Sequence, residues 1–279
     1  MNDHFNTPLE VIKGNINADV AKANLSIGKM ILLGIMAGAF IALGGATSST
    51  AVHGISDVGL ARTLAGAIFP VGLMMIVFVG GELFTGNCLI ILAVLNKKVS
   101  AGQLVRDLVV VYFSNLLGAL AIDFLIFYSG NLDYSNGLLG AYTIKVALAK
   151  VNISPVKAAA SGILCNMLVC MAILMAGAAK DIAGKALAIF FPIWAFVVGG
   201  FEHCVANMFY IPAGMLAASN ADYVAKAEEA YGITQAQCES LNILQSLHNF
   251  IPVTIGNIIG GAVCIGVMYF CIHRKNLEK

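Results

Sequence analysis

An acid and an imidazole stand side by side in a long apolar stretch of the chain, as Glu202 and His203 in the motif GGFEHCVANM. They are the only Asp, Glu, Lys, Arg or His residues between Ala186 and Ala218. A neutral imidazole offers one hydrogen-bond donor and one acceptor, and an imidazolium offers two donors. Ionisable residues inside such segments are rare and usually line a cavity or pair with each other, so His203 is a candidate gate for a solute that changes its protonation state. The alternative is a structural histidine hydrogen-bonded between helices.

The neighbouring acid is expected to have a different role, because adjacent residues of a helix do not face each other. If His203 faces a path, Glu202 points away into the protein and ties down the backbone. Glu82 has the same place in a second motif, GGELFTGN, and we expect the same structural role for it. In that motif the hydroxyl of Thr85 could reach toward His203, with ordinary packing as the alternative. Two apolar neighbours would form constrictions: Leu83 and Phe84.

Other chemistries find no support in the residue spacing. Glu202, His203 and Cys204 are consecutive, so their side chains diverge on a regular backbone, and no HExxH motif occurs. The seven cysteines show neither paired disulfide spacing nor a CxxC motif, and small hydrophobic packing residues explain them. The sequence therefore predicts no metal site, no cofactor and no hydrolase, and hence no enzyme.

The composition describes the surroundings of these residues. Of 279 residues, 59% are hydrophobic and 11% are charged, with a mean hydropathy of +0.87. Soluble domains carry about 25% charged residues, so the composition predicts an integral membrane protein. We expect it in the cell membrane. The net charge is +1 and no basic patch stands out, which argues against nucleic acid as a partner.

Six segments are long enough to cross the hydrocarbon core, which needs about 20 apolar residues. They are residues 27–52, 63–95, 108–130, 157–178, 186–218 and 250–272. Six spans place both termini on one side of the membrane. The Lys and Arg residues divide eleven to five in favour of the side of the termini, so both termini are expected in the cytoplasm.

The second and fifth spans are too long for one straight helix. Residues 186–218 would form a helix about 50 Å long, against a core of about 30 Å. Each of the two carries a Gly-Gly pair followed by a polar cluster, and Gly-Gly favours a helix break. The third span of each half then repeats Asn-x-x-Gly, as NLLG (115–118) and NIIG (257–260).

These features predict one all-α transmembrane domain over residues 1–279, built as a 3+3 inverted repeat with broken second and fifth helices. Irregular backbone at membrane depth lines a cavity or is buried in protein, and broken helices at matching positions point to a transport site. The expected parts are a cytoplasmic N-terminal helix (1–26), two three-span repeats (27–130 and 157–272) and a cytoplasmic tail (273–279).

Three further features are assigned from local sequence. Thr7, Pro8 and Glu10 form an N-cap, first-turn and capping-box signal for the N-terminal helix. Gly34 and Gly38 in the first span suggest close helix contact, within a subunit or between subunits. Lys150, in the outer connection, reads by composition as a solvated surface lysine; the functional alternative is a cation that draws anions toward a vestibule.

Four motifs, in order, resemble the formate/nitrite transporter family: GELFTGN, GILCNMLVC, GFEHCVANMFYIP and IPVTIGNIIGG. The resemblance covers essentially the whole chain. It implies an aquaporin-like six-helix protomer, a homopentamer with one pore per subunit, and passage of small monovalent anions of weak acids across the lipid bilayer. Within the family, the whole sequence is most similar to the hydrosulfide channel branch, with formate or nitrite transport, coupled to protons, as the alternative.

The resemblance also assigns roles to individual residues. It implies that His203 is the central pore residue, Thr85 its partner, and Lys150 a buried lysine that favours anions. Polar pore positions would be Asn166, Asn207 and Asn257. One constriction would comprise Phe69, Leu73 and Phe196. Leu83 and Phe84 would be parts of the other, and Val169 would face the pore.

Two rival classes have specific requirements that the sequence does not meet. A water or glycerol channel would carry a pair of Asn-Pro-Ala motifs, which are absent. An intramembrane hydrolase using Glu202 or His203 would need a nucleophile or metal partner at workable spacing. The choice between a channel and a proton-coupled carrier stays open.

Overall fold

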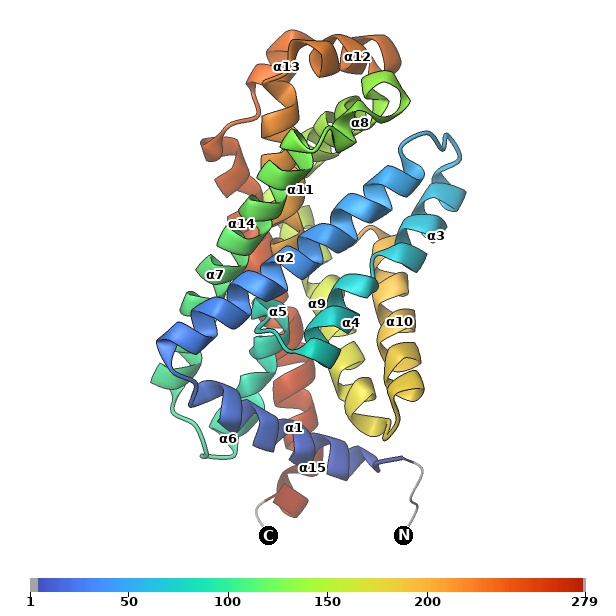
Figure 1. Cartoon of the computed structure of the whole chain (residues 1–279). Helices are drawn as coiled ribbons and strands as arrows, with labels where there is room; N and C mark the ends of the chain where they lie inside the picture. The colour runs from blue at the N-terminus through green and yellow to red at the C-terminus, as the bar shows by residue number, and fades with distance from the viewer. Residues whose placement is uncertain (1–4, 278–279) are drawn as a thin grey trace.

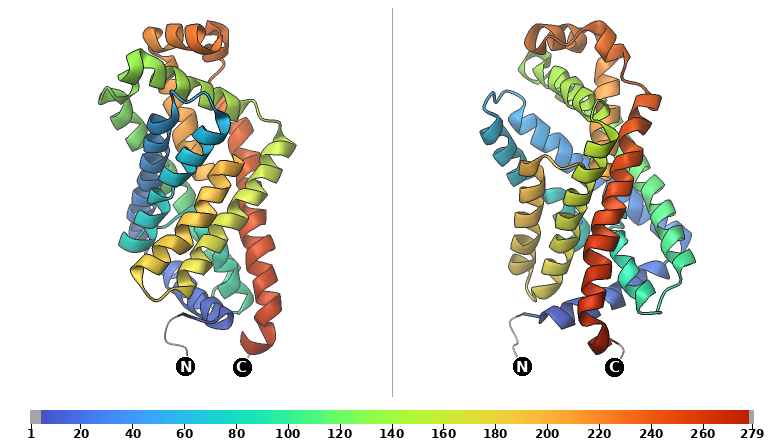
Figure 2. Two further views of the ribbon diagram at one scale, coloured as in Figure 1. Left: turned by 90° about the vertical axis from the view of Figure 1, so that its right-hand side faces the viewer. Right: turned by 180° about the vertical axis from the view of Figure 1, so that it is seen from behind.

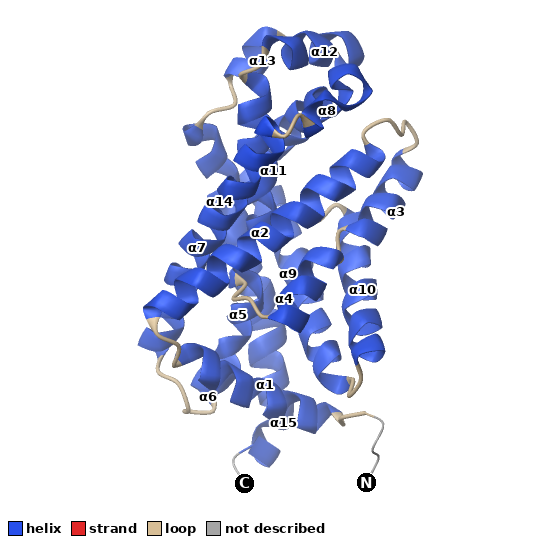
Figure 3. Cartoon of the chain, viewed as in Figure 1, coloured by secondary structure: helices blue, strands red, loops and turns tan. Residues whose placement is uncertain are grey.

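The computed structural model describes residues 5–277 and is helical throughout, apart from turns and one isolated bridge (Figures 1 and 3). Lys279 and the first four residues of the expected N-terminal segment lie outside this range. The helices of the first half are α1 (Pro8–Ala23), α2 (Ile27–Val52), α3 (Val58–Ile68), α4 (Val71–Val79), α5 (Phe84–Asn87), η1 (Cys88–Ile90), α6 (Ile91–Leu95) and α7 (Ala101–Tyr128).

A short turn η2 (Asn131–Asp133) leads to the second half. Its helices are α8 (Tyr134–Val151), α9 (Pro155–Ala178), α10 (Ile182–Gly199), α11 (Cys204–Ala218), α12 (Ala221–Tyr231), α13 (Gln235–Glu239), α14 (Ile243–Ile258), the π-helix η3 (Ile259–Val267) and α15 (Met268–Leu277).

Within residues 5–277, six segments are long and apolar enough to cross a membrane, as the sequence predicts. They are Ile27–Val52, Val58–Val79, Ala101–Tyr128, Pro155–Ala178, Ile182–Gly199 and Ile243–Leu277.

The remaining helices close the two ends of the bundle. Helix α1 lies across one end, where both termini also lie (Figures 1 and 2). Its Thr7 backbone N–H and hydroxyl both donate to Glu10 at 2.7 Å, so the predicted capping box forms. At the other end, α8, α12 and α13 form a cap around their own cluster of buried side chains. None of these three helices was predicted, because a search for about 20 consecutive apolar residues detects membrane-spanning segments only.

Small residues bring α2 and α7 into close contact. A Cβ atom at Gly38 would overlap the backbone of Asn115, and one at Gly118 would overlap the backbone of Ile35. The Gly34 and Gly38 motif therefore serves contact within the subunit, where the sequence left the choice open. This packing sets Asn115 against the middle of the membrane-spanning region.

Both helical paths with a Gly-Gly motif are interrupted at that motif. Helix α4 ends at Val79 and α5 begins at Phe84; α10 ends at Gly199 and α11 begins at Cys204. Gly80 has φ +106° and Gly200 has φ +66°, a backbone region that L side chains rarely adopt. The glycines thus let the chain leave each helix, and the residues that follow place buried side chains inside the bundle: Glu82, Leu83, Glu202 and His203.

Candidate functional site

Thr85 and His203 meet across the two interruptions. The Thr85 hydroxyl lies 2.9 Å from Nε2 of His203, although 118 positions separate them in the chain. Both side chains are buried, at 0% and 3% exposure. Two segments from opposite halves therefore meet at one polar contact inside an apolar core, as expected from the sequence.

The second ring nitrogen of His203 determines which hydrogen bonds the ring can offer. Nδ1 accepts the backbone N–H of Ala206 at 3.0 Å and so caps the first turn of α11. In the neutral ring the proton then lies on Nε2, which points to Thr85. A proton added at Nδ1 would break the cap and put a cation at the positive end of the α11 dipole. This geometry favours a neutral histidine that donates through Nε2.

The extended residues of both interruptions lack helical hydrogen-bond partners, and one asparagine in each half supplies them. Asn257 accepts from the N–H of Cys204 at 2.9 Å and donates to the carbonyls of Gly162 at 2.8 Å and Glu202 at 3.0 Å. Backbone groups at membrane depth must be paired within the protein. The Asn257 amide meets that need in the second half.

Asn115 does the same in the first half. It accepts from the N–H of Phe84 at 2.9 Å and donates to the carbonyls of Gly34 at 2.8 Å and Glu82 at 2.9 Å. Each contact of Asn257 thus has a counterpart at Asn115. The asparagine of each Asn-x-x-Gly motif therefore satisfies the backbone groups at one helix break, through the same set of hydrogen bonds in both halves.

The two glutamates next to the interruptions are each held by a lysine and an asparagine. Glu202 contacts Lys150 Nζ at 2.6 Å and accepts from Asn207 at 2.7 Å. These contacts anchor the interruption, which is the supporting role expected for Glu202.

Glu82 is held in the same way, with Lys22 Nζ at 3.4 Å and Asn87 donating at 2.7 Å. The two lysines come from matching segments, KANLS (22–26) and KVNIS (150–154), at the ends of α1 and α8. Lys22 and Asn87 received no role in the sequence reading, although this five-residue similarity was a signal for them.

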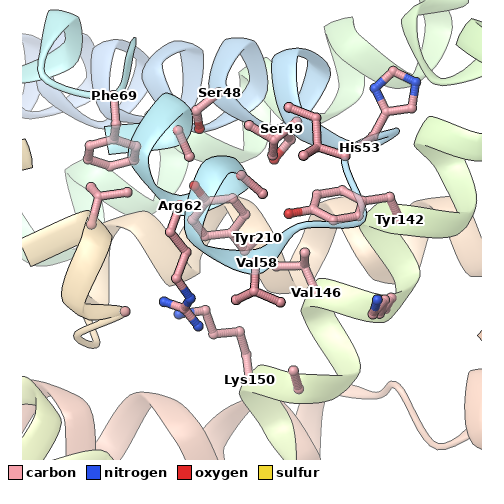
Figure 4. Close-up of a pocket in the computed structure, with 18 of the residues that line it drawn as sticks. Ser48, Ser49, His53, Val58, Arg62, Phe69, Tyr142, Val146, Lys150 and Tyr210 are labelled. Carbon is pink, nitrogen blue, oxygen red and sulfur yellow. The ribbon is translucent and has the colours of Figure 1, made fainter. Parts of the chain in front are cut away.

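A cavity of about 760 Å³ (Figure 4) opens on the side of the α8–α12 cap. Glu202 and His203 are among the residues that line it. Glu202 therefore borders the cavity as well, in contrast to the expectation that it points away. The residues at the break do not follow helical geometry, so the rule for adjacent helical side chains does not hold there. Lys150 also lines the cavity, with a side chain 19% exposed.

The apolar residues expected as constrictions lie at the deep end of this cavity and beyond it. Phe69 and Phe196 line the cavity and meet edge to face, with ring centroids 5.5 Å apart. Phe196 also stacks on His203 at 5.9 Å. The others are buried at 1–3% exposure and are not part of the cavity wall: Leu73, Leu83, Phe84 and Val169.

The three asparagines predicted to line the pore differ in their hydrogen-bond partners and in their contact with the cavity. Asn166 is fully buried and donates to the carbonyls of Thr85 at 3.1 Å and Asn257 at 2.7 Å, so its amide holds the backbone rather than facing the cavity. Asn207 lines the cavity, yet its amide nitrogen donates to Glu202 and Asn249. The amide of Asn257 is bound to backbone, as described above. These asparagines shape the interruptions, and their side-chain N–H groups are already used.

Two further cations line the cavity, and neither was expected there from the sequence. Arg62 lines the cavity from α3, and Lys145 lines it from α8 with Nζ 4.2 Å from the centroid of the Tyr231 ring. Arg62 is the only Lys or Arg between Lys29 and Lys97, which was an available signal. No group of three His, Cys, Asp or Glu side chains suited to a metal ion occurs among residues 5–277.

Comparison with known proteins places this arrangement among transport proteins. The family model described as formate/nitrite transporter matches residues 9–271. The formate channel FocA of Haemophilus influenzae is 37% identical over 94% of this chain and 92% of its own length. A probable formate transporter of Methanothermobacter thermautotrophicus is 36% identical over 99% of this chain and 100% of its own length. Among solved structures, a pentameric formate channel with formate bound matches with a TM-score of 0.78 at 33% identity, covering 89% of this chain and 98% of that chain.

Proposed function

Because this chain belongs to the formate/nitrite transporter family, we propose that it forms a membrane channel for small monovalent anions of weak acids, with formate as the main substrate. The family and the solved relatives are transport proteins, and the protein is not an enzyme. The names of the relatives favour formate over hydrosulfide, which the overall sequence resemblance ranked first. Nitrite and hydrosulfide are the alternative substrates, and the experiment below tests them beside formate.

The proposed architecture is an aquaporin-like 3+3 inverted repeat over residues 27–130 and 157–272. The matched contacts of Asn115 and Asn257 support it, as do the repeated lysine segments at the ends of α1 and α8. We propose that five copies assemble with one pore each, in line with the pentameric solved relative. Both termini would lie in the cytoplasm, because the Lys and Arg majority lies on their side.

The proposed path begins in the outer cavity and passes the Phe69, Leu73 and Phe196 constriction. It then reaches Thr85 and His203 and leaves through Leu83 and Phe84, with Val169 on its wall. The observation that carries this proposal is the Thr85–His203 hydrogen bond at the inner end of a cation-lined cavity, between two helix interruptions.

The chemistry of this path suits a weak acid. A bare anion in a narrow apolar passage is strongly disfavoured by the loss of its hydration. In the cavity, the positive charge of Lys150 offsets part of this cost. Between the constrictions, the Nε2–H of His203 and the hydroxyl of Thr85 replace hydrogen bonds that the anion made with water. Transfer of the protonated, neutral acid across the apolar constrictions requires less desolvation energy than transfer of the anion.

Liposomes that contain the purified protein test the proposal when formate, nitrite and hydrosulfide are supplied in parallel. We expect formate flux well above that of protein-free vesicles and reduced by Lys150→Ala. The matched control is Lys157→Ala, at an exposed lysine outside the cavity lining. Lys145 is unsuited as a control because it lines the cavity. Hydrosulfide flux that clearly exceeds formate flux would reverse the substrate assignment, and no flux of any of the three would end the proposal.

A further inference from the structure

Arg62 projects into the outer cavity from the same face of α3 as the constriction residue Phe69. Seven residues separate the two, which is two helical turns or about 10.5 Å. Ala65, between them on this face, also lines the cavity. A group moving inward along this wall passes Arg62 before it meets the aromatic constriction.

Among residues 5–277, no carboxylate balances the charge of Arg62. Within residues 5–277, the cavity is lined by three cationic side chains, Arg62, Lys145 and Lys150, and by a single carboxylate, Glu202. Lys150 and Asn207 already bind both oxygens of that carboxylate. No carboxylate lies within 4.0 Å of the Arg62 guanidinium in this part of the chain. The cavity therefore carries an excess of positive charge centred on a group that lacks a partner.

The break after α10 leaves room for this guanidinium. Gly200 ends α10 with φ +66°, and a Cβ atom there would overlap the Arg62 side chain. The N–H of Gly200 bonds to the carbonyls of Phe196 and Val197, so the helix end is capped by its own backbone. Arg62 donates no hydrogen bond to a carbonyl within residues 5–277, which argues against a mere capping role.

Arg62 and Lys150 reach the same part of the cavity from different elements. Figure 4 shows the two side chains extending from α3 and α8 toward one another. Lys150 is already paired with Glu202 at 2.6 Å, so the uncompensated positive charge at this point lies on Arg62, with the ammonium of Lys150 beside it. An anion that enters the cavity is attracted most strongly to this group.

We infer that Arg62, whose guanidinium fits against Gly200, forms together with the neighbouring Lys150 an outer binding subsite for planar anions with two oxygens, carboxylates and nitrite. A guanidinium presents parallel N–H donors that match two oxygens of one anion, which an ammonium does not. A hydrosulfide ion has one acceptor atom and cannot be held in that way. The inference rests on the proposed route and adds a selectivity step before the constriction.

The test compares two variants. Arg62→Lys keeps the positive charge but loses the parallel N–H donors of the guanidinium, and Arg62→Gln loses both the charge and these donors. Apparent KM values for formate and hydrosulfide are measured by flux into liposomes, and binding is measured separately from the line width of ¹³C-formate in detergent-solubilised protein. Lys157→Gln serves as the control. Thermal stability of each oligomer shows whether a variant is intact.

Arg62→Lys should raise the formate KM about 2- to 5-fold, the range of a partly exposed ion pair, and leave hydrosulfide unchanged. Arg62→Gln should raise the KM of both anions and abolish formate line broadening. An intact Arg62→Lys oligomer with unchanged formate KM and binding would overturn the inference. So would an Arg62→Lys oligomer in which the KM values for formate and hydrosulfide rise equally. Failure of the wild-type protein to pass formate is a different result, because it ends the proposed function while line broadening still reports on the subsite.

Discussion

At the scale of single residues, the ring of His203 is committed on both sides. Its Nδ1 accepts from the first turn of α11 and its Nε2 faces Thr85. The sequence suggested that titration of this histidine gates the solute. The hydrogen bonds instead support a donor that keeps its charge state while the solute changes its own.

His203→Asn is the variant that separates these two views. An asparagine can still cap α11, but its short side chain withdraws the donor from Thr85. We expect formate flux to fall about 10- to 100-fold, the loss of one hydrogen bond to a charged group. The ratio of variant to wild-type flux should stay constant from pH 6 to pH 8. A histidine-like inflection present only in the wild type would instead show that His203 titrates.

At the scale of elements, the two interruptions share their contacts but differ in charge. Asn207 donates to Asn249 at 2.8 Å in the second half, where Asn87 donates to Asp107 at 2.8 Å in the first. The side of α1 therefore carries an extra buried carboxyl. Asp19 of α1 is a further buried carboxyl near it, at 3% exposure and bonded to Asn15 at 2.6 Å.

Docking of α1 should consequently depend on pH. Burial raises the pKa of Asp19 from 3.8 to about 7, with Lys22 opposing the rise and Glu82 and Asp107 adding to it. The folded state thus binds this proton more tightly than the undocked state does. Docking is strongest below about pH 4, weakens as the pH rises toward 7, and is constant above that, over a range of at most about 4 kcal/mol.

Hydrogen exchange of the α1 amides at pH 5 and pH 8, corrected for intrinsic rates, measures this effect. Asp19→Asn should protect α1 more than the wild type at pH 8 and should remove the pH dependence. Glu228→Gln, at an exposed carboxylate of α12, is the control. An unchanged pH dependence in Asp19→Asn would assign the effect to another group.

At the scale of the whole molecule, the two ends are distinct. Helix α1 and the end of α15 lie at one end, and the α8–α12–α13 cap lies at the other (Figure 2). Residues of α8 and α12 line the cavity, so it opens on the side of the cap. Lys98 contacts Asn17 of α1 at the first end, and Lys226 lies on α12 at the second. The excess of Lys and Arg at the first end predicts that this end faces the cytoplasm.

A membrane-impermeant thiol reagent applied to intact cells tests this orientation. With the exposed Cys271 replaced by Ser, a cysteine at position 226 should be labelled and one at position 98 spared. The cytoplasmic assignment fails if Lys98→Cys is labelled and Lys226→Cys is not. Labelling after membrane permeabilisation serves as the control that both thiols are accessible.

Local patterns in the sequence were sufficient to predict the six membrane segments, the positions of both helix interruptions and the capping box of α1. Apolar length, Gly-Gly pairs and cap residues act over a few residues, so they can be read along the chain. For Thr85 the sequence left two alternatives, a hydroxyl that reaches toward His203 and ordinary packing, and only the family resemblance implied the first.

The tertiary structure alone decided which side chains share the cavity and what each is bound to. Lys150 looked like a surface lysine by composition, yet it pairs with Glu202 across 52 positions. Arg62 carried no local motif and gains its place only because α3 packs against α10 beside Gly200. Such contacts join segments far apart in the chain, and charge and hydrogen-bond partners depend on distances that no local periodicity encodes.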